Sequence, residues 1–153
     1  MPAPLSHTAI APHAKHLSTQ RFGKAHHLCS RKQIQALFAG GSSSMTDYPL
    51  RMVYRFVPRT QANVPVQVML SVAKRHLRHA VARNRAKRQL REAYRHEQHR
   101  LLPLFNTPEA ADEGLQVAFV WLQSKPATTA QITRKVARLL QRLAERHATA
   151  RCI

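Results

Sequence analysis

The chain has 153 residues, 44% of them hydrophobic, which is enough for one domain with a single core. Its 25 Lys and Arg stand against seven Asp and Glu, and the resulting formal charge of +18 favours a polyanionic partner that relieves the self-repulsion. No apolar run approaches the roughly 18 residues of a membrane span, and no lipidation signal or bulky amphipathic anchor is evident, so we expect no membrane association and a cytoplasmic location.

The N-terminal residues 1–20 are rich in Pro, Ala, His, Ser and Thr and have neither a strand period nor a helical period. We therefore predict a flexible N-terminal tail, a folded domain over residues 21–148 and a short C-terminal tail over 149–153. The cysteines, Cys29 and Cys152, lie far apart, so no disulfide framework is expected. No further Cys or His pair at ligand spacing accompanies Cys29, and no metal site is predicted.

Order is predicted to begin at Ser30, which forms a capping-box spacing with Gln33. A short helix follows, with its apolar face formed by Ile34, Leu37 and Phe38. The sequence GGSSS, residues 40–44, then predicts a loop.

Two alternating segments predict strands. Residues 50–57 alternate so that one side of the strand carries Leu50, Met52, Tyr54 and Phe56. A turn region with two prolines leads to a second alternation, formed by Val66, Val68, Leu70 and Val72. The simplest connection between the two strands is a hairpin.

The second half of the chain predicts a helix, a strand and a helix. A helical period runs from about Ala80 to Leu102, where Pro103 helps to end it. The nearly continuous apolar run 115–122 predicts a central strand buried on both faces. Thr128 and Gln131 repeat the capping-box spacing before a terminal helix with an apolar stripe, formed by Ile132, Val136, Leu139, Leu140 and Leu143. This order of elements predicts an α+β sandwich, a small mixed sheet covered by helices, with room for one more short strand.

The helix around RNRAKRQLREAYR, residues 83–95, concentrates basic residues on one face. Glu92 is the only acid between Lys74 and Arg95, so the like charges destabilise the helix until an external anion binds. A merely solvated face normally mixes both signs. Arginine favours phosphate because its guanidinium pairs with two oxygens. RNA is favoured over DNA, since no zinc-finger or leucine-zipper pattern appears.

The segment from Leu70 to Arg95 resembles the signature of the protein subunit of bacterial ribonuclease P. A strand ends in S-V-A-K-R, and a helix follows with the pattern R-N-R-x-K-R-x-x-R-E. The resemblance extends over roughly residues 22–147. It implies a two-layer α/β sandwich in which the basic helix lies in a left-handed β-α-β crossover, whereas sequence alone favours the commoner right-handed connection.

The resemblance also implies a function. The protein would assist an RNA subunit whose bound Mg²⁺ ions hydrolyse the phosphodiester that joins the 5′ leader to a precursor tRNA, and it would have no catalytic residue of its own. The residues agree, because a two-metal protein nuclease needs clustered carboxylates and the seven acids here are scattered. The expected partners are the ribonuclease P RNA and precursor tRNA, with no obligate protein partner.

Matching residues to the family motif assigns two surfaces. Contact with the RNA subunit is predicted for Arg83, Asn84, Arg85, Lys87, Arg88 and Arg91. The cleft that receives the leader is predicted to contain Phe38, Met52, Tyr54, Ser71, Lys74 and Arg75. For each of the aromatic residues, core packing is the alternative to stacking on an unpaired base.

Two other functions remain as alternatives. A general structured-RNA or ribosome-associated binding protein explains the charge but not the order of the motif. A stand-alone protein nuclease predicts cleavage without an RNA subunit, which the scattered acids disfavour.

Overall fold

The computed structural model describes residues 22–59 and 64–152, so the predicted N-terminal tail lies outside the described residues. The strands are β1 (Ser43–Asp47), β2 (Leu50–Pro58), β3 (Val66–Ser71) and β4 (Glu113–Trp121). The α-helices are α2 (Arg31–Phe38), α3 (Ala80–Glu97) and α4 (Thr129–Arg151). Short 3-10 helices are η1 (Lys24–His26), η2 (Gln98–Arg100), η3 (Leu102–Phe105) and η4 (Pro108–Ala110). The predicted α+β class is confirmed.

The four strands form one mixed sheet in the order β1-β2-β4-β3. β4 pairs antiparallel with β2 and parallel with β3, so the predicted hairpin between β2 and β3 is wrong. The physical reason is that β4 is apolar on both faces and occupies the central position, where both of its edges are paired and both faces are covered. The parallel pair β3 and β4 is joined through α3, and the hand of this crossover stays a prediction.

The strand β1 lies where part of a loop was predicted. Gly40 and Gly41 have φ angles of +114° and +79°, which favour glycine and turn the chain after α2 as expected. Ser43 and Ser44 then pair with β2, and Asp47 lies opposite Leu50 across a turn formed by Tyr48 and Pro49. The sheet therefore gains an edge strand that the polar sequence of residues 43–47 did not indicate.

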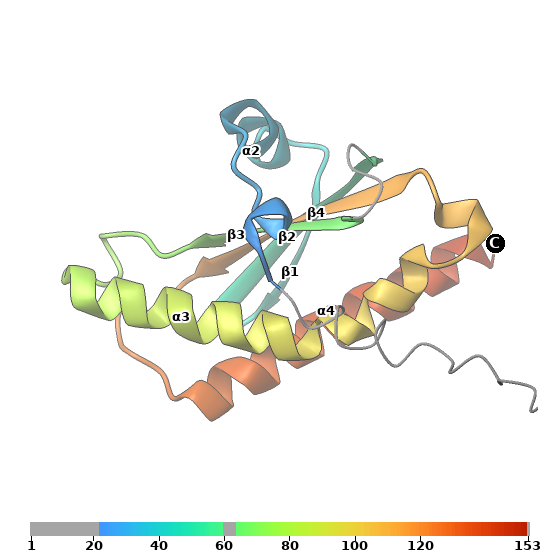
Figure 1. Ribbon diagram of the computed structural model, residues 1–153. Helices are drawn as coiled ribbons and strands as arrows, with labels where there is room; N and C mark the ends of the chain where they lie inside the picture. Colours follow the sequence, from blue (N-terminus) through green and yellow to red (C-terminus); the bar gives the residue numbers. More distant parts are fainter. Residues whose placement is uncertain (1–21, 60–63, 153) are drawn as a thin grey trace, which may run out of the picture.

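Helices cover the two faces of the sheet unequally (Figure 1). α3 and α4 pack against each other on one face and bury the main core, which includes Leu90, Phe119, Trp121 and Leu140. The predicted stripe of α4 is buried in full. α2 lies on the opposite face, where Leu37 packs with a smaller cluster formed by Leu28, Val53 and Ala118. The two layers place α2 and α3 on opposite sides of the strands (Figure 1).

Capping residues define the starts of α2 and α4, and two helices end at residues other than those predicted. The side chains of Ser30 and Thr128 accept hydrogen bonds from the backbone N–H of Gln33 and Gln131, at 3.4 and 3.2 Å. α3 ends at Glu97 rather than near Leu102, because the chain continues in the 3-10 helices η2 and η3, and Pro103 is the second residue of η3. α4 continues to Arg151, so residues 149–151 are helical rather than part of a tail.

In the described part of the chain, no helix is both long and apolar enough to cross a membrane.

Candidate RNA interface

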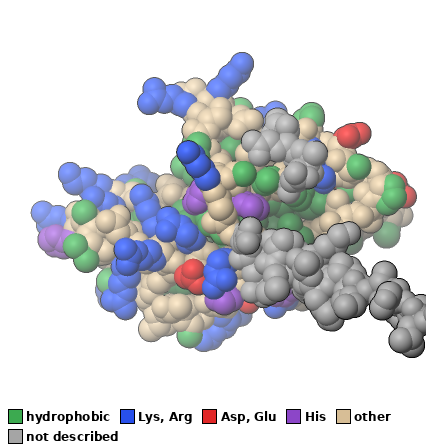
Figure 2. Space-filling model, in the orientation of Figure 1, with side chains coloured by type: hydrophobic (Ala, Val, Ile, Leu, Met, Phe, Trp, Pro, Cys, Tyr) green, Lys and Arg blue, Asp and Glu red, His purple; other side chains and the backbone are tan. Residues whose placement is uncertain are grey.

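The basic face of α3 is exposed because the opposite face supplies the core. Ala86, Leu90, Ala93 and Tyr94 are buried at helical spacing and hold α3 against the sheet and α4. The predicted residues Asn84, Arg85, Arg88 and Arg91 are exposed, and Arg83 and Lys87 are half-buried. Figure 2 shows Lys and Arg side chains gathered over α3 and α2 with few acidic side chains between them. We name the exposed set, with Lys87, the α3 surface.

Arg83 differs from the other motif arginines because it bonds to its own chain. Its Nη1 donates hydrogen bonds to the carbonyl oxygens of Leu77, at 2.9 Å, and Arg78, at 2.7 Å. These bonds tie the loop between β3 and α3 to the first turn of the helix. The sequence placed Arg83 among the RNA contacts, whereas the structure gives its guanidinium a role in holding the loop that carries Lys74 and Arg75.

Two hollows open on the α3 surface and share Val81 and Arg85. One has a volume of about 290 Å³ and reaches Gln89 and Pro126, and the other, of about 380 Å³, reaches Asn84 and Arg88. Val81 is 81% exposed, so it is an apolar residue on the surface of the helix. It lies four residues before Arg85 and off the line of Ala86 and Leu90, a spacing from which its exposure could have been predicted.

The side chain of Gln89 fixes the α3 surface relative to the start of α4. Gln89 is buried, and its Nε2 donates to the carbonyl oxygen of Ala127 at 2.8 Å and to Thr129 Oγ1 at 3.4 Å. A buried amide that loses such partners is costly, so this bond orients the two helices. Arg85 therefore stands beside the N-terminal end of α4.

The one acid of α3 near this surface is already engaged. Glu92 accepts a hydrogen bond from Arg95 Nη2 at 2.9 Å, and this bond is the main cause that lowers the pKa of Glu92. On the other side, burial lowers the pKa of His27, and the charge of Arg91 lowers it further. The α3 surface thus keeps a positive potential that an anion can neutralise.

The predicted leader residues divide between two faces of the sheet. Phe38 is 48% exposed at the end of α2, Ser71 is half-buried at the end of β3, and Lys74 and Arg75 are exposed in the following loop. The structure brings these four to the side of α2 or to the loop beside it. We name this side, together with the exposed Arg51 and Arg55 of β2, the α2 face.

The prediction that Met52 and Tyr54 lie in the leader cleft is wrong. Met52 is 0% exposed and Tyr54 is 4% exposed, and both lie in the main core under α3 and α4. Because side chains alternate along a strand, the residues of β2 that point toward α2 are Arg51, Val53 and Arg55. The prediction chose the wrong face of the strand, and the exposed side chains of β2 on the α2 side are Arg51 and Arg55.

The acids of the chain are dispersed and mostly paired with bases. Ion pairs join Asp47 to Lys135 and Arg138, Glu97 to Arg100, and Glu113 to Arg151. Within residues 22–59 and 64–152, no group of three or more His, Cys, Asp and Glu side chains is arranged to hold a metal ion. The acids in the described residues are therefore not clustered as a protein-bound magnesium ion would require.

The fold and the two basic surfaces define a small α+β protein suited to RNA phosphates. The family model of ribonuclease P matches residues 22–144, and the chain belongs to this family of tRNA-processing ribonucleoprotein components. The ribonuclease P protein component of Chlorobium phaeobacteroides is 36% identical over 103 residues, covering 65% of this chain and 70% of that protein. That of Porphyromonas gingivalis is 40% identical over 84 residues, covering 55% and 60%.

Solved structures support the fold. The RNase P protein of Staphylococcus aureus matches with a TM-score of 0.58 at 18% identity, over 78% of this chain and 96% of that chain. The RNase P protein of Thermotoga maritima matches with a TM-score of 0.58 at 16% identity, over 76% and 96%. Family membership implies that the chain is a subunit of an endoribonuclease and associates with ribonuclease P RNA.

Proposed function

We propose that the α3 surface binds the ribonuclease P RNA and that the α2 face binds the 5′ leader of precursor tRNA. The protein then assists RNA-catalysed removal of the leader, which gives the mature 5′ end of the tRNA. We place this work in the cytoplasm.

The main support for the proposal is that two arginines of the α3 surface are unpaired among the described residues. Arg85 and Arg88 have no hydrogen-bond or ion-pair partner among the described residues, although Arg83 and Arg95 on the same helix have theirs. An exposed guanidinium held on a rigid helix without a carboxylate partner is available to pair with two phosphate oxygens. Asn84 and Val81 beside them offer an amide and an apolar contact to the sugar or base.

The α2 face supports the second half of the proposal. Arg51 and Arg55 of β2 and Lys74 and Arg75 of the loop are exposed cations near one side of the sheet, and Phe38 is an exposed aromatic ring. A basic surface with an accessible ring is the combination that binds single-stranded nucleic acid, through phosphates and base stacking. A leader is a single strand, so it suits this face.

The chemistry is assigned to the RNA partner. Magnesium ions bound mainly by the RNA subunit would supply the electrophilic catalysis, and the protein would bind and orient the two RNAs. No catalytic role is proposed for any residue of this chain. The ion pairs that occupy Asp47, Glu92, Glu97 and Glu113 support this division.

The proposal is tested by precursor tRNA cleavage with the ribonuclease P RNA at limiting magnesium. The reaction is run without protein, with the wild-type chain, and with Arg85→Ala and Arg88→Ala combined. We expect the wild-type chain to restore cleavage and the double variant to restore it less. Cleavage by the protein alone, or restoration by the variant equal to the wild type, contradicts the proposal.

Salt dependence separates specific assembly from general RNA binding. The four basic residues of the α3 surface, Arg85, Lys87, Arg88 and Arg91, predict a log-log slope of about −3 to −4 for the constant of binding to the ribonuclease P RNA. A general structured-RNA binder shows equal affinity for ribonuclease P RNA and an unrelated folded RNA at moderate salt. The proposed function predicts that only the former stays bound.

A further inference from the structure

A third basic surface lies at the opposite end of α4 from the α3 surface. An open groove of about 810 Å³ lies between the C-terminal half of α4 and the edge strand β1. Its lining includes Met45, Arg142, Glu145, Arg146, Thr149 and Ala150. We name it the α4–β1 groove, and nothing in the proposed function uses it.

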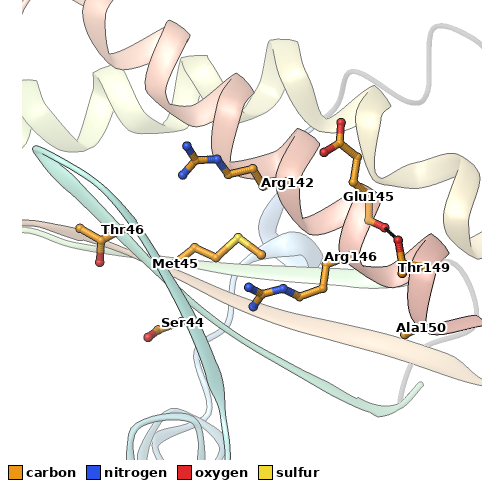
Figure 3. Close-up of a pocket in the computed structure, with 8 residues that line it drawn as sticks. All are labelled: Ser44, Met45, Thr46, Arg142, Glu145, Arg146, Thr149 and Ala150. Carbon is orange, nitrogen blue, oxygen red and sulfur yellow. Dashed lines mark hydrogen bonds between the residues drawn. The ribbon is translucent and has the colours of Figure 1, made fainter.

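The side chains of the groove are arranged for an anion (Figure 3). Arg142 and Arg146 direct their guanidinium groups toward β1, and Met45 extends from β1 toward the helix. Glu145 directs its carboxylate away from these groups and accepts a hydrogen bond from Gln141 Nε2 at 3.2 Å. The acid in the lining therefore faces outward while both cations face the groove.

The two arginines are held to different degrees. Arg142 is exposed and has no hydrogen-bond or ion-pair partner among the described residues. Arg146 Nη1 donates to the hydroxyl of Tyr54 at 3.1 Å, which fixes its guanidinium beside β2 while the side chain stays exposed. The hydroxyl of the buried Tyr54 thus holds Arg146 in position, whereas Arg142 can change its conformation to bind a ligand.

The end of the groove nearer the start of α4 carries further positive charge. Asp47 of β1 is 11% exposed and faces two cations, Lys135 Nζ at 3.0 Å and Arg138 Nη1 at 3.3 Å. One carboxylate against two cations leaves an excess of one positive charge beside Arg142. Because Asp47 is already paired and the carboxylate of Glu145 faces outward, neither acid competes with an incoming phosphate.

The groove is separate from the α3 surface. Arg85 stands beside the N-terminal end of α4, which Gln89 binds at Thr129, and Arg146 lies seventeen residues further along the same helix. At a rise of about 1.5 Å per residue, the two places are about 26 Å apart along the axis. Neighbouring phosphates of one nucleotide step cannot reach both.

We infer that the α4–β1 groove binds a second segment of RNA sugar–phosphate backbone, apart from the segment held by the α3 surface. Arg142 and Arg146 pair with phosphate oxygens, and Met45 and Ala150 contact the ribose. This inference rests on the proposed function, because it takes RNA as the partner. The charge of +18 argues against a second copy of this chain as the occupant.

The test compares matched single variants of α4 in binding to the ribonuclease P RNA over a range of salt. Arg142→Ala removes an exposed, unpaired arginine from the groove. Arg134→Ala removes an exposed arginine of the same helix that does not line the groove and has no partner among the described residues. We expect Arg142→Ala to reduce the magnitude of the log-log slope by about 0.7–0.9 and Arg134→Ala to leave it unchanged.

Footprinting then shows whether two RNA segments are bound. Hydroxyl-radical protection of the RNA is compared for the wild type, Arg85→Ala, and Arg142→Ala combined with Arg146→Lys, which keeps one charge in the groove. We expect each variant to lose protection of a different segment and the effects to add, since the sites are far apart. Thermal unfolding of each variant verifies that the fold is retained.

Each outcome has a distinct meaning. If Arg142→Ala leaves both slope and protection unchanged while Arg85→Ala alters them, the groove inference is overturned and the proposed function stands. Equal effects of Arg134→Ala and Arg142→Ala also overturn it, because the groove then has no special role. If Arg85→Ala changes neither quantity, the proposed function fails, whatever the groove variants do.

Discussion

Replacing Arg83 by Ala separates a structural arginine from the arginines of the same motif that we propose to contact RNA. Arg83 is half-buried and donates two hydrogen bonds from Nη1 to the carbonyl oxygens of Leu77 and Arg78. Hydrogen bonds that involve a charged group contribute about 1.5–3 kcal/mol when buried. Because Arg83 is partly solvated, we expect Arg83→Ala to cost about 1–2 kcal/mol in the free energy of unfolding.

A loss of this size is measurable. For a domain of this length it corresponds to a fall of about 3–10 °C in Tm. Arg85→Ala serves as the matched control, because Arg85 lies two residues away, is exposed and has no partner among the described residues. Its substitution should change stability by less than about 0.5 kcal/mol.

Arg83→Ala should have the larger effect on stability, and Arg85→Ala should have the larger effect on RNA binding. Arg85→Ala should reduce the magnitude of the salt slope by about 0.7–0.9, and Arg83→Ala should reduce it less. Arg83→Lys, which keeps the charge, should still lower Tm because a lysine ammonium does not reproduce the guanidinium geometry. The reasoning is refuted if Arg83→Ala leaves Tm unchanged and reduces the salt slope as much as Arg85→Ala does.

Three further predictions concern other parts of the fold. Asp47→Asn should lower the free energy of unfolding by about 1.5–3 kcal/mol in chemical denaturation, because Lys135 loses its charged partner at 3.0 Å; a stability equal to wild type contradicts this. His147 has a side chain only 10% exposed, and burial lowers its pKa below the usual 6.5. The unfolded state then binds more protons below about pH 6.5, so stability should fall as the pH drops from 6.5 toward the lowered folded pKa. His147→Gln should flatten this fall, leaving the part due to His27, and an unchanged pH profile excludes the assignment. Phe38→Ala should weaken binding of leader-bearing precursor tRNA by about 5- to 100-fold in a filter-binding assay, as expected for one stacked base, with mature tRNA unaffected; equal weakening of both ligands speaks against a leader contact.

The sequence by itself determined the helices that matter for function and their chemical character. Thr128 and Ser30 set the helix starts through local capping bonds, and the periods of α3 and α4 separated core residues such as Leu90 from basic ones. The nearly continuous apolar run of β4 predicted its central place. The order of basic residues after the strand ending in Ser71 indicated the family that the comparison with known proteins then showed. These features are local, so neighbouring residues alone decide them.

Only the tertiary structure decided which partners meet across the chain. Alternation in β2 left open which side faces α2, because both sides are partly apolar, and the packing of α4 buried Met52 and Tyr54. The insertion of β4 between β2 and β3 replaced the expected hairpin, since pairing both edges of β4 buries more apolar surface than a local turn. The role of Arg83 likewise depends on how the loop before α3 folds back onto the helix. Each of these outcomes is set by contacts or geometry that the pattern of residues along the chain does not encode.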